Sequence, residues 1–176
     1  MLIQAFTDGS CLSNGEDNAV GGYGAVLSFI FQGEVRTKEV SGSITNTTNN
    51  RAELTAVIKA MESVKGSHDW KFTLDSKYVI DIAEGNKNPK LNLDLWKRYQ
   101  DLRSMHKSVS FFWVGGHTGD VLNERCNLLA QTAANQQAMF MARQASALEV
   151  KQEIIEDIVA KKKQLSFLQR LFGGKE

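Results

Sequence analysis

The alternation of hydrophobic and polar residues predicts a sheet of five strands. Residues 3–10 and 21–31 are almost wholly apolar, which indicates buried strands, and residues 34–43 alternate as a half-exposed strand does. Turns rich in Gly, Asn and Asp join these three segments, so we expect an antiparallel meander. Two later apolar runs, 70–76 and 109–114, predict the fourth and fifth strands.

Helical periodicity separates the later strands. One apolar stripe has the spacing i, i+3, i+4 and i+7 and consists of Leu54, Val57, Ile58 and Met61. We expect this stripe to lie on the sheet. We expect further helices at 77–84 and after Asn92, which we expect to cap the third helix. A long helical segment begins near Asn123.

This long segment covers residues 123–172. No Gly or Pro interrupts residues 123–172, which as one helix would span about 75 Å. Residues 146–149 read Ser-Ala-Leu-Glu, which has the form of a capping box. We therefore expect a break there, with a new helix beginning after it.

Composition narrows the class of protein. A chain of 176 residues with 42% hydrophobic content suits one domain plus an appendage. The net charge of +1 gives no global signal for a polyanion, so any nucleic-acid surface must be a local patch. Cys11 and Cys126 lack metal-ligand spacing, and we interpret both as small, partly buried hydrophobic residues. With no leader or long apolar run, we expect a cytoplasmic protein without a membrane span.

Three acidic residues stand in positions that suggest chemistry. Asp8 lies within an apolar strand, where an unpartnered carboxylate costs several kcal/mol. Asp75 ends the strand at 70–76, and functional sites of α/β sheets gather at such strand ends. Glu53 borders the apolar stripe and could point towards Asp8. The alternatives are that Asp8 opens a turn and that Glu53 is an ordinary first-turn acid.

A histidine follows the fifth strand. His117 lies in the glycine-rich loop 115–120. Alone it would be interpreted as a solvated loop residue. At the mouth of a carboxylate site it becomes a candidate proton carrier.

Five sequence blocks resemble type 1 ribonuclease H of the bacterial and phage kind. They run in order through about residues 1–135: FTDGSCL at 6–12, GGYGA at 21–25, TTNNRAEL at 47–54, DSKYV at 75–79, and WVGGH at 113–117 with NERC at 123–126. The resemblance implies an α/β ribonuclease H-like fold. Its five-stranded mixed sheet would have three antiparallel strands first and helices on both faces, with a helical C-terminal extension here.

The resemblance also implies an activity. Such enzymes hydrolyse the RNA strand of RNA/DNA hybrids and leave a 5′-phosphate, as in primer or R-loop removal. Two Mg²⁺ ions, for which Mn²⁺ is a possible substitute, would be held by Asp8, Glu53 and Asp75. Hard carboxylate oxygens suit these ions, and two ions can activate water and stabilise the leaving oxygen. By resemblance, His117 serves proton transfer or product release.

The same resemblance assigns a substrate surface. Asn14 and Thr48 would belong to a pocket for a phosphate of the DNA strand, and Asn49 and Asn50 would contact hybrid backbone and base edges in the minor groove. The set of expected substrate-binding residues also includes Gly9, Ser10 and Arg51. Uncharged donors suit recognition of hybrid shape without sequence specificity. Ordinary helix capping is the alternative for residues 47–50.

Asn127 departs from the family pattern, because it stands where a fourth catalytic and metal-binding acid is expected. An amide keeps one acceptor oxygen but loses the charge. We expect weaker binding of the second ion and slower turnover. Three explanations stay open: a natural variant of reduced activity, a site in which Glu124 or Asp120 compensates, or a deliberate change that traps substrate.

A second departure is a deletion. Family members carry a basic helical handle between the segments that here end at Val79 and begin at Leu91. Only residues 80–90 occupy that place. We expect hybrid binding by the catalytic domain to be weaker and less dependent on salt than it would be with the handle.

The third departure is an addition. We expect a catalytic domain at 1–135 and a helical extension at 136–176. The extension carries an apolar stripe followed by the lysines at 161–163. It could fold back on the domain, form a dimer seam, or replace the missing handle by presenting these lysines to phosphates.

The end of the chain suggests a partner. Residues 164–168, Gln-Leu-Ser-Phe-Leu, resemble the short sliding-clamp-binding peptide of replication proteins, with the final Leu-Phe order reversed. We expect residues 164–172 to seek a groove on a sliding clamp or another replication protein. Two functions compete with that of an active nuclease. Asn127 suggests a catalytically impaired hybrid-binding module, and the tail suggests a replisome adaptor.

Overall fold

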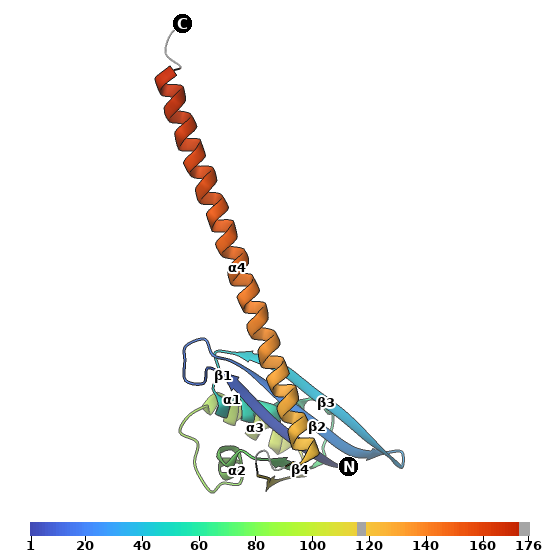
Figure 1. Cartoon of the computed structure of the whole chain (residues 1–176). Helices are drawn as coiled ribbons and strands as arrows, with labels where there is room; N and C mark the ends of the chain where they lie inside the picture. The colour runs from blue at the N-terminus through green and yellow to red at the C-terminus, as the bar shows by residue number, and fades with distance from the viewer. Residues whose placement is uncertain (116–118, 173–176) are drawn as a thin grey trace. The chain divides into compact units, whose positions relative to one another are not determined.

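The computed structural model describes residues 1–115 and 119–172 (Figure 1). The chain separates into two compact units, Met1–Gln137 and Ala138–Glu176, which we describe one at a time. In the described ranges, no helix is both long enough and apolar enough to cross a membrane.

A five-stranded mixed sheet forms the centre of the first unit. Its strands are β1 (Leu2–Leu12), β2 (Val20–Phe31), β3 (Glu34–Thr45), β4 (Asp69–Leu74) and β5 (Ser108–Trp113), in the order β3-β2-β1-β4-β5. The first three strands pair antiparallel, and β4 runs parallel to both β1 and β5. This is the predicted mixed sheet with its antiparallel meander.

In the described part of the chain, four helices accompany the sheet: α1 (Asn49–Glu62), α2 (Lys77–Ala83), α3 (Leu93–Met105) and α4 (Val121–Phe172). The predicted stripe of α1 is buried in the core together with Ile3, Trp70 and Phe72 of the sheet. Trp96 and Tyr99 bring α3 into the same core. Between α2 and α3 this fully described stretch holds no further helix, so the handle is absent as the sequence indicated.

Glycines let α4 approach the opposite face of the sheet. A Cβ on Gly22 would lie 2.0 Å from the carbonyl oxygen of Ala130, and one on Gly24 would lie 2.2 Å from that of Cys126. A Cβ on the neighbouring Gly21 would instead meet Thr47 at 2.6 Å, just before α1. Successive strand residues face opposite sides, so α1 and the start of α4 cover opposite faces. The prediction of helices on both faces is confirmed.

Two sequence expectations were wrong, and a third was right in position only. No break occurs at residues 146–149, because α4 is helical from Val121 to Phe172. A capping box begins a helix only where the chain before it is not helical, and here helix formers without Gly or Pro precede Ser146.

The other two corrections concern a cap and a strand end. Asn92 occupies the N-cap position of α3 but makes no capping hydrogen bond, since its side chain contacts Arg51 and Tyr78 instead. The end of β2 does face solvent, because Ile30 and Phe31 are 66% and 53% exposed.

Candidate active site

Strand pairing brings the first two predicted acids together. Asp8 is not in a turn, because Gly9 and Ser10 continue β1 in pairing with Tyr23 and Gly22. The parallel pairing of β1 with β4 ends at Phe6 and Thr73, two residues before Asp8 and Asp75 respectively. Asp8 and Asp75 therefore lie at neighbouring positions at the same end of the β1–β4 pair.

Close packing of α1 on β1 supplies the third acid. A Cβ on Gly9 would lie 2.2 Å from the backbone nitrogen of Glu53, so only glycine allows this approach. Glu53 is 5% exposed and Asp8 is 7% exposed. One carboxylate oxygen from each of Asp8, Glu53 and Asp75 lies within 4.8 Å of the others. Glu53 thus points towards Asp8, as the sequence suggested.

The electrostatics of this cluster suit it to holding a cation. Burial raises the pKa of Glu53 well above its usual range, and the charges of Asp8 and Asp75 raise it further. Oε2 of Glu53 is buried and has no hydrogen-bond partner among the described residues. Three hard oxygen ligands with such a buried, unsatisfied atom fit a divalent cation of the Mg²⁺ type.

Asn127 is placed by α4. It follows Cys126, whose carbonyl lies against Gly24, and Gly24 is paired with Asp8 across β1 and β2. The start of α4 therefore covers the face of the sheet that carries Asp8. Asn127 is partly exposed, and its Oδ1 accepts a hydrogen bond from Gln131.

Neither neighbouring acid joins the cluster in the described part of the chain. Oδ1 of Asp120 accepts hydrogen bonds from the backbone N–H groups of Leu122 and Asn123, at 3.0 and 3.1 Å, and so caps α4. Glu124 lies in the first turn of α4, outside the group of three. Because Asp120 caps α4, its carboxylate is not placed to replace the charge that Asn127 lacks. His117 lies outside the described residues.

The N-terminus of α1 gathers three of the predicted substrate-binding residues. Thr48 is the N-cap, and its side chain accepts from the backbone N–H of Arg51 at 3.4 Å. Oδ1 of Asn14 accepts from the backbone N–H of Asn49 at 2.9 Å. Asn14, Thr48 and Asn49 therefore meet, and Asn50 follows exposed in the first turn. The alternative role of helix capping is also present, at Thr48.

Arg51 has a structural partner that the sequence did not reveal. Its guanidinium donates two hydrogen bonds to Asp94 of α3, at 2.9 and 2.7 Å, and a third to Asn92 at 3.3 Å. No spacing rule connects positions 43 residues apart. The geometry makes Arg51 a link between α1 and α3.

Sequence reasoning also missed two features, one beside the cluster and one at the start of α4. The indole N–H of Trp113 donates to the carbonyl oxygen of Asp75 at 3.2 Å, and the ammonium of Lys77 lies 4.9 Å from the Trp113 ring centroid. Asn123 is 4% exposed, and its Oδ1 has no partner among the described residues. A polar residue one helical turn before Asn127 was the available signal for Asn123.

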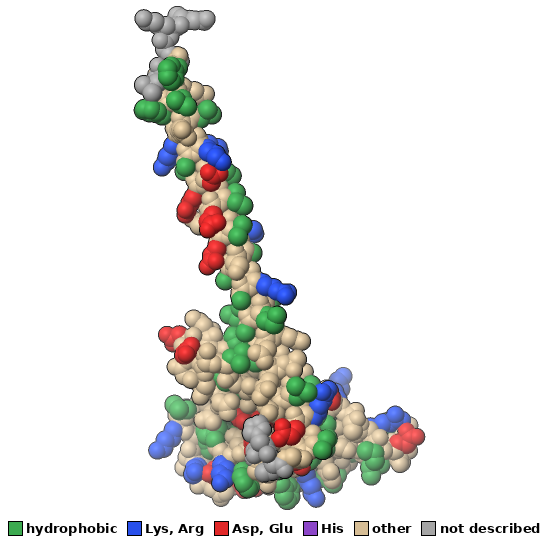
Figure 2. Space-filling model, viewed as in Figure 1, with side chains coloured by type: hydrophobic (Ala, Val, Ile, Leu, Met, Phe, Trp, Pro, Cys, Tyr) green, Lys and Arg blue, Asp and Glu red, His purple; other side chains and the backbone are tan. Residues whose placement is uncertain are grey.

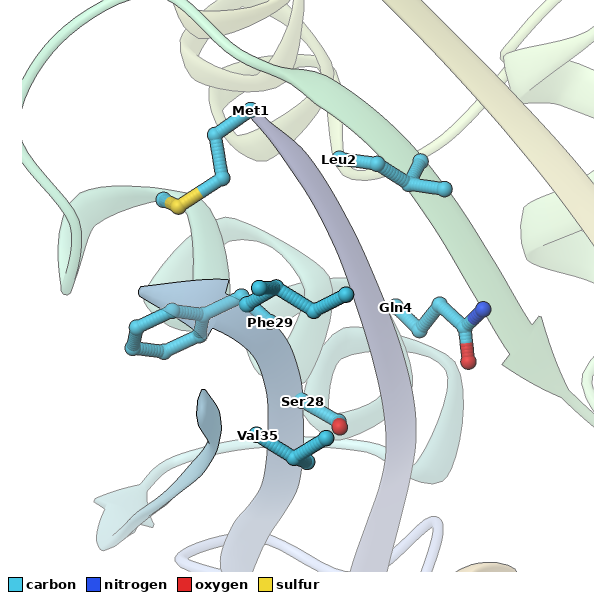
Figure 3. A pocket seen from close by; sticks show the side chains of 7 residues that line it. Met1, Leu2, Gln4, Ser28, Phe29 and Val35 are labelled. Atoms are coloured by element: carbon cyan, nitrogen blue, oxygen red, sulfur yellow. The ribbon is translucent and has the colours of Figure 1, made fainter. Parts of the chain in front are cut away.

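The apolar hollow of Figure 3 is a different feature. It has a volume of about 430 Å³ and includes Met1, Leu2, Phe29 and Val35 in its lining. None of the predicted site residues lines it. The acidic cluster lies further along β1, and we do not associate the hollow with it.

Known proteins share both the sequence and the fold. The family model RNase H matches residues 2–135. Ribonuclease H of Shewanella baltica is 42% identical over 146 residues, which cover 76% of this chain and 88% of that protein. The structure of LC9-RNase H1, a type 1 RNase H with the type 2 active-site motif, has a TM-score of 0.66 at 34% identity. That match covers 77% of this chain and 73% of the other.

A further solved structure extends the likeness in fold. LC11-RNase H1, solved in complex with RNA/DNA hybrid, matches with a TM-score of 0.62 at 22% identity. The match covers 77% of this chain and 99% of that one. Since the family model spans most of the chain and includes the strand, helix and loop blocks singled out above, the chain belongs to the ribonuclease H family.

Proposed function

We propose that this chain hydrolyses the RNA strand of RNA/DNA hybrids by two-metal-ion catalysis. The observation that carries the proposal is the buried cluster of Asp8, Glu53 and Asp75, whose ligand oxygens lie within 4.8 Å of one another. The names of the relatives support the reaction class, and the structure of LC11-RNase H1 with a hybrid supports the substrate class.

The chain's own residues would hold the cofactor. When bound, two Mg²⁺ ions would supply an activated water and stabilise the leaving oxygen. Asp8, Glu53 and Asp75 would hold these ions together, since one carboxylate oxygen of each lies within 4.8 Å of the others. Trp113 steadies the backbone of Asp75 through its hydrogen bond, which keeps that carboxylate in place. His117 would assist proton transfer or product release.

Substrate recognition would use the N-terminus of α1. The side chains of Asn14 and Thr48 meet there beside backbone N–H groups, and helix N-termini favour phosphate oxygens. Asn49 and Asn50 would contact the minor groove together with Gly9 and Ser10. Without a handle between α2 and α3, the catalytic unit would neutralise few phosphates, which predicts modest affinity with a shallow salt dependence.

Asn127 would limit the rate rather than change the reaction. Its amide lacks the charge that attracts a second cation. The test is single-turnover cleavage of a labelled hybrid with Mg²⁺, using this chain, Asn127→Asp and Asp8→Asn. We expect both of the first two to cut, Asn127→Asp faster, and Asp8→Asn to be inactive. If neither of the first two cuts while both bind hybrid, the chain is instead a hybrid-binding module.

A second candidate function is tethering of the chain to the replication machinery. The tethered enzyme would then remove primers or R-loops in the cytoplasm. The observation that favours it is the exposed end of α4, where Leu165, Phe167 and Phe172 are 60%, 60% and 83% exposed. We expect a sliding clamp to retain the intact chain and to release a chain that lacks residues 164–176. Equal binding of both chains would exclude this role for the tail.

A further inference from the structure

Two histidines meet at the end of the sheet opposite the acidic cluster. His68 immediately precedes β4, and His106 immediately follows α3. Their rings are stacked, with centroids 6.2 Å apart. Both side chains are partly buried, and neither is visible on the face drawn in Figure 2, where described histidines are purple. Asp75 follows the other end of β4, so a strand length of on the order of 20 Å separates the pair from the carboxylates.

A hydrogen bond between these two residues requires that one ring be neutral. The backbone N–H of His68 donates to Nδ1 of His106 at 3.3 Å. A ring nitrogen accepts only while it carries no proton, so this bond exists only with neutral His106, whose single ring proton is then on Nε2. Protonation at Nδ1 would turn two donors towards each other and break the bond.

The His68 ring offers no good place for a second proton either. Its Nε2 lies 2.8 Å from the carbonyl oxygen of Lys65, which fixes the proton of the neutral ring on Nε2. Its Nδ1 is buried and has no hydrogen-bond partner among the described residues. Charging both rings would therefore leave a buried donor unsatisfied and place two cations side by side.

The bond closes a junction between the end of α3 and the start of β4. The carbonyl oxygen of His68 accepts from the backbone N–H of Lys107 at 2.9 Å, so the His68 backbone is held on both sides. The His106 ring also packs edge-on against Trp70, with 5.5 Å between centroids, and Trp70 is completely buried. Loss of the His106 bond would loosen this junction and give water access to Trp70.

Positive charge predominates around the pair. The charged residues within three positions of either histidine are Lys65, Asp69, Lys71, Arg103 and Lys107. The amino-terminal residue adds another positive group, because the Met1 carbonyl oxygen accepts from the backbone N–H of Asp69 at 3.0 Å. The carboxylate of Asp69 is itself engaged with the hydroxyl of Ser108 at 2.8 Å. Burial lowers the pKa of His106, and the charge of His68 lowers it further.

We propose that the His68–His106 pair is an acid-sensitive latch, in which protonation of His106 at Nδ1 releases the end of α3 from the start of β4. The latch is closed at neutral pH. The open form takes up protons in the ordinary range of a histidine, near pH 6.5, whereas the closed form does so only at lower pH. Opening therefore becomes more favourable as pH falls, through His106 alone by at most about tenfold for each pH unit below 6.5. The carboxylate cluster plays no part, so the latch does not rest on the nuclease function.

Amide hydrogen exchange of the full chain, followed by NMR, measures the opening. Between pH 7 and pH 5.5 we expect the protection factor of the Lys107 amide to fall by up to about tenfold. The Phe72 amide, in the interior of β4, should keep its protection and is the internal control. His106→Asn keeps an acceptor oxygen close to the place of Nδ1 but takes up no proton. Its Lys107 protection should therefore not vary between these pH values.

Two results would overturn the latch. One is an equal pH dependence of Lys107 protection in the original chain and in His106→Asn. The other is a midpoint at or above about pH 6.5 for the ring titration of His106, measured by NMR on the original chain. The second measurement needs no variant, so it tests the latch even where His106→Asn does not fold.

Discussion

The side-chain amide of Gln131 donates a 2.9 Å hydrogen bond to Oδ1 of Asn127. This bond uses one lone pair of the only Asn127 atom that could act as a hard metal ligand. The position therefore lacks a negative charge and has a ligand atom already engaged within α4. Both properties would make it a weaker metal ligand than an aspartate at the same position.

Replacing Asn127 with Asp should restore the missing ligand. We expect the Mg²⁺ concentration for half-maximal cleavage to fall and the single-turnover rate to rise by about 10- to 100-fold, a factor comparable to the loss that follows mutation of residues supporting a bound metal. A Mg²⁺ titration of hybrid cleavage measures both quantities. Gln131→Ala serves as the control, since it frees the amide oxygen without adding charge. Identical Mg²⁺ curves for Asn127 and Asp would show that the fourth acid is dispensable here.

Glu53→Gln should make the chain more stable and less active. The substitution removes a buried carboxylate that the charges of Asp8 and Asp75 disfavour. Without divalent ions we expect the free energy of unfolding at neutral pH to rise by on the order of 1 kcal/mol. Urea unfolding with EDTA, and again with Mg²⁺, measures the change. Mg²⁺ should stabilise the original chain more than the variant; equal stabilisation would place the cation elsewhere.

The same carboxylate predicts a pH dependence. Because the pKa of Glu53 is raised on folding, the unfolded chain releases this proton at a lower pH than the folded chain does. In EDTA, its effect on stability is absent below about pH 4.3, and stability declines as pH rises through the higher folded pKa. The difference between the chain and Glu53→Gln, measured from pH 4 to 8, isolates this contribution. A difference that does not vary with pH would contradict the shift.

Gly22→Ala should loosen α4 from the sheet. The new Cβ would lie 2.0 Å from the backbone oxygen of Ala130, so the helix or the strand must move. We expect a loss of about 1–3 kcal/mol in unfolding free energy. Gly42→Ala is a matched control in the neighbouring strand, because its Cβ would meet the side-chain end of Tyr23, which can rotate. Equal losses for the two variants would refute the close approach of α4.

Asp94→Asn should weaken the link between α1 and α3. The Arg51 guanidinium lowers the pKa of Asp94 to about 2. Its stabilisation is therefore complete above the unfolded pKa of about 3.9 and is lost as pH falls towards 2. Since Asp94 is 61% exposed, we expect a cost of only about 0.5–1 kcal/mol at pH 7.

The same variant tests whether Arg51 serves the substrate. Asp101→Asn, which breaks the exposed pair with Lys97 on the same helix, is the control for the loss of a surface acid. If Arg51 also binds hybrid, freeing it from Asp94 should tighten hybrid binding in an equilibrium titration. Unchanged affinity would leave Arg51 with its structural role alone.

Most of the sheet could be predicted because the pattern of apolar residues within a short segment indicates a buried strand. The segments 3–10 and 70–76 are examples. The meeting of Asp8 with Glu53 was less accessible, since it depends on Gly9 allowing α1 to touch β1. The Arg51 link joins distant positions and leaves no periodic signal. The expected break at Ser146 failed because a capping box is a local pattern, whereas helix continuity depends on the residues on both sides.

The hydroxyl group of Tyr78 links α2 to the start of α3, the two elements on either side of the segment where the handle is missing. Oη of Tyr78, in α2, accepts hydrogen bonds of 3.0 Å from the side chains of Asn92 and Trp96, at the start of α3. Lengthening a loop between fixed ends costs little entropy, which rises only with the logarithm of its length. Residues 84–91 are therefore a suitable insertion site. A basic helix inserted there would raise hybrid affinity and leave the rest of the domain unaltered.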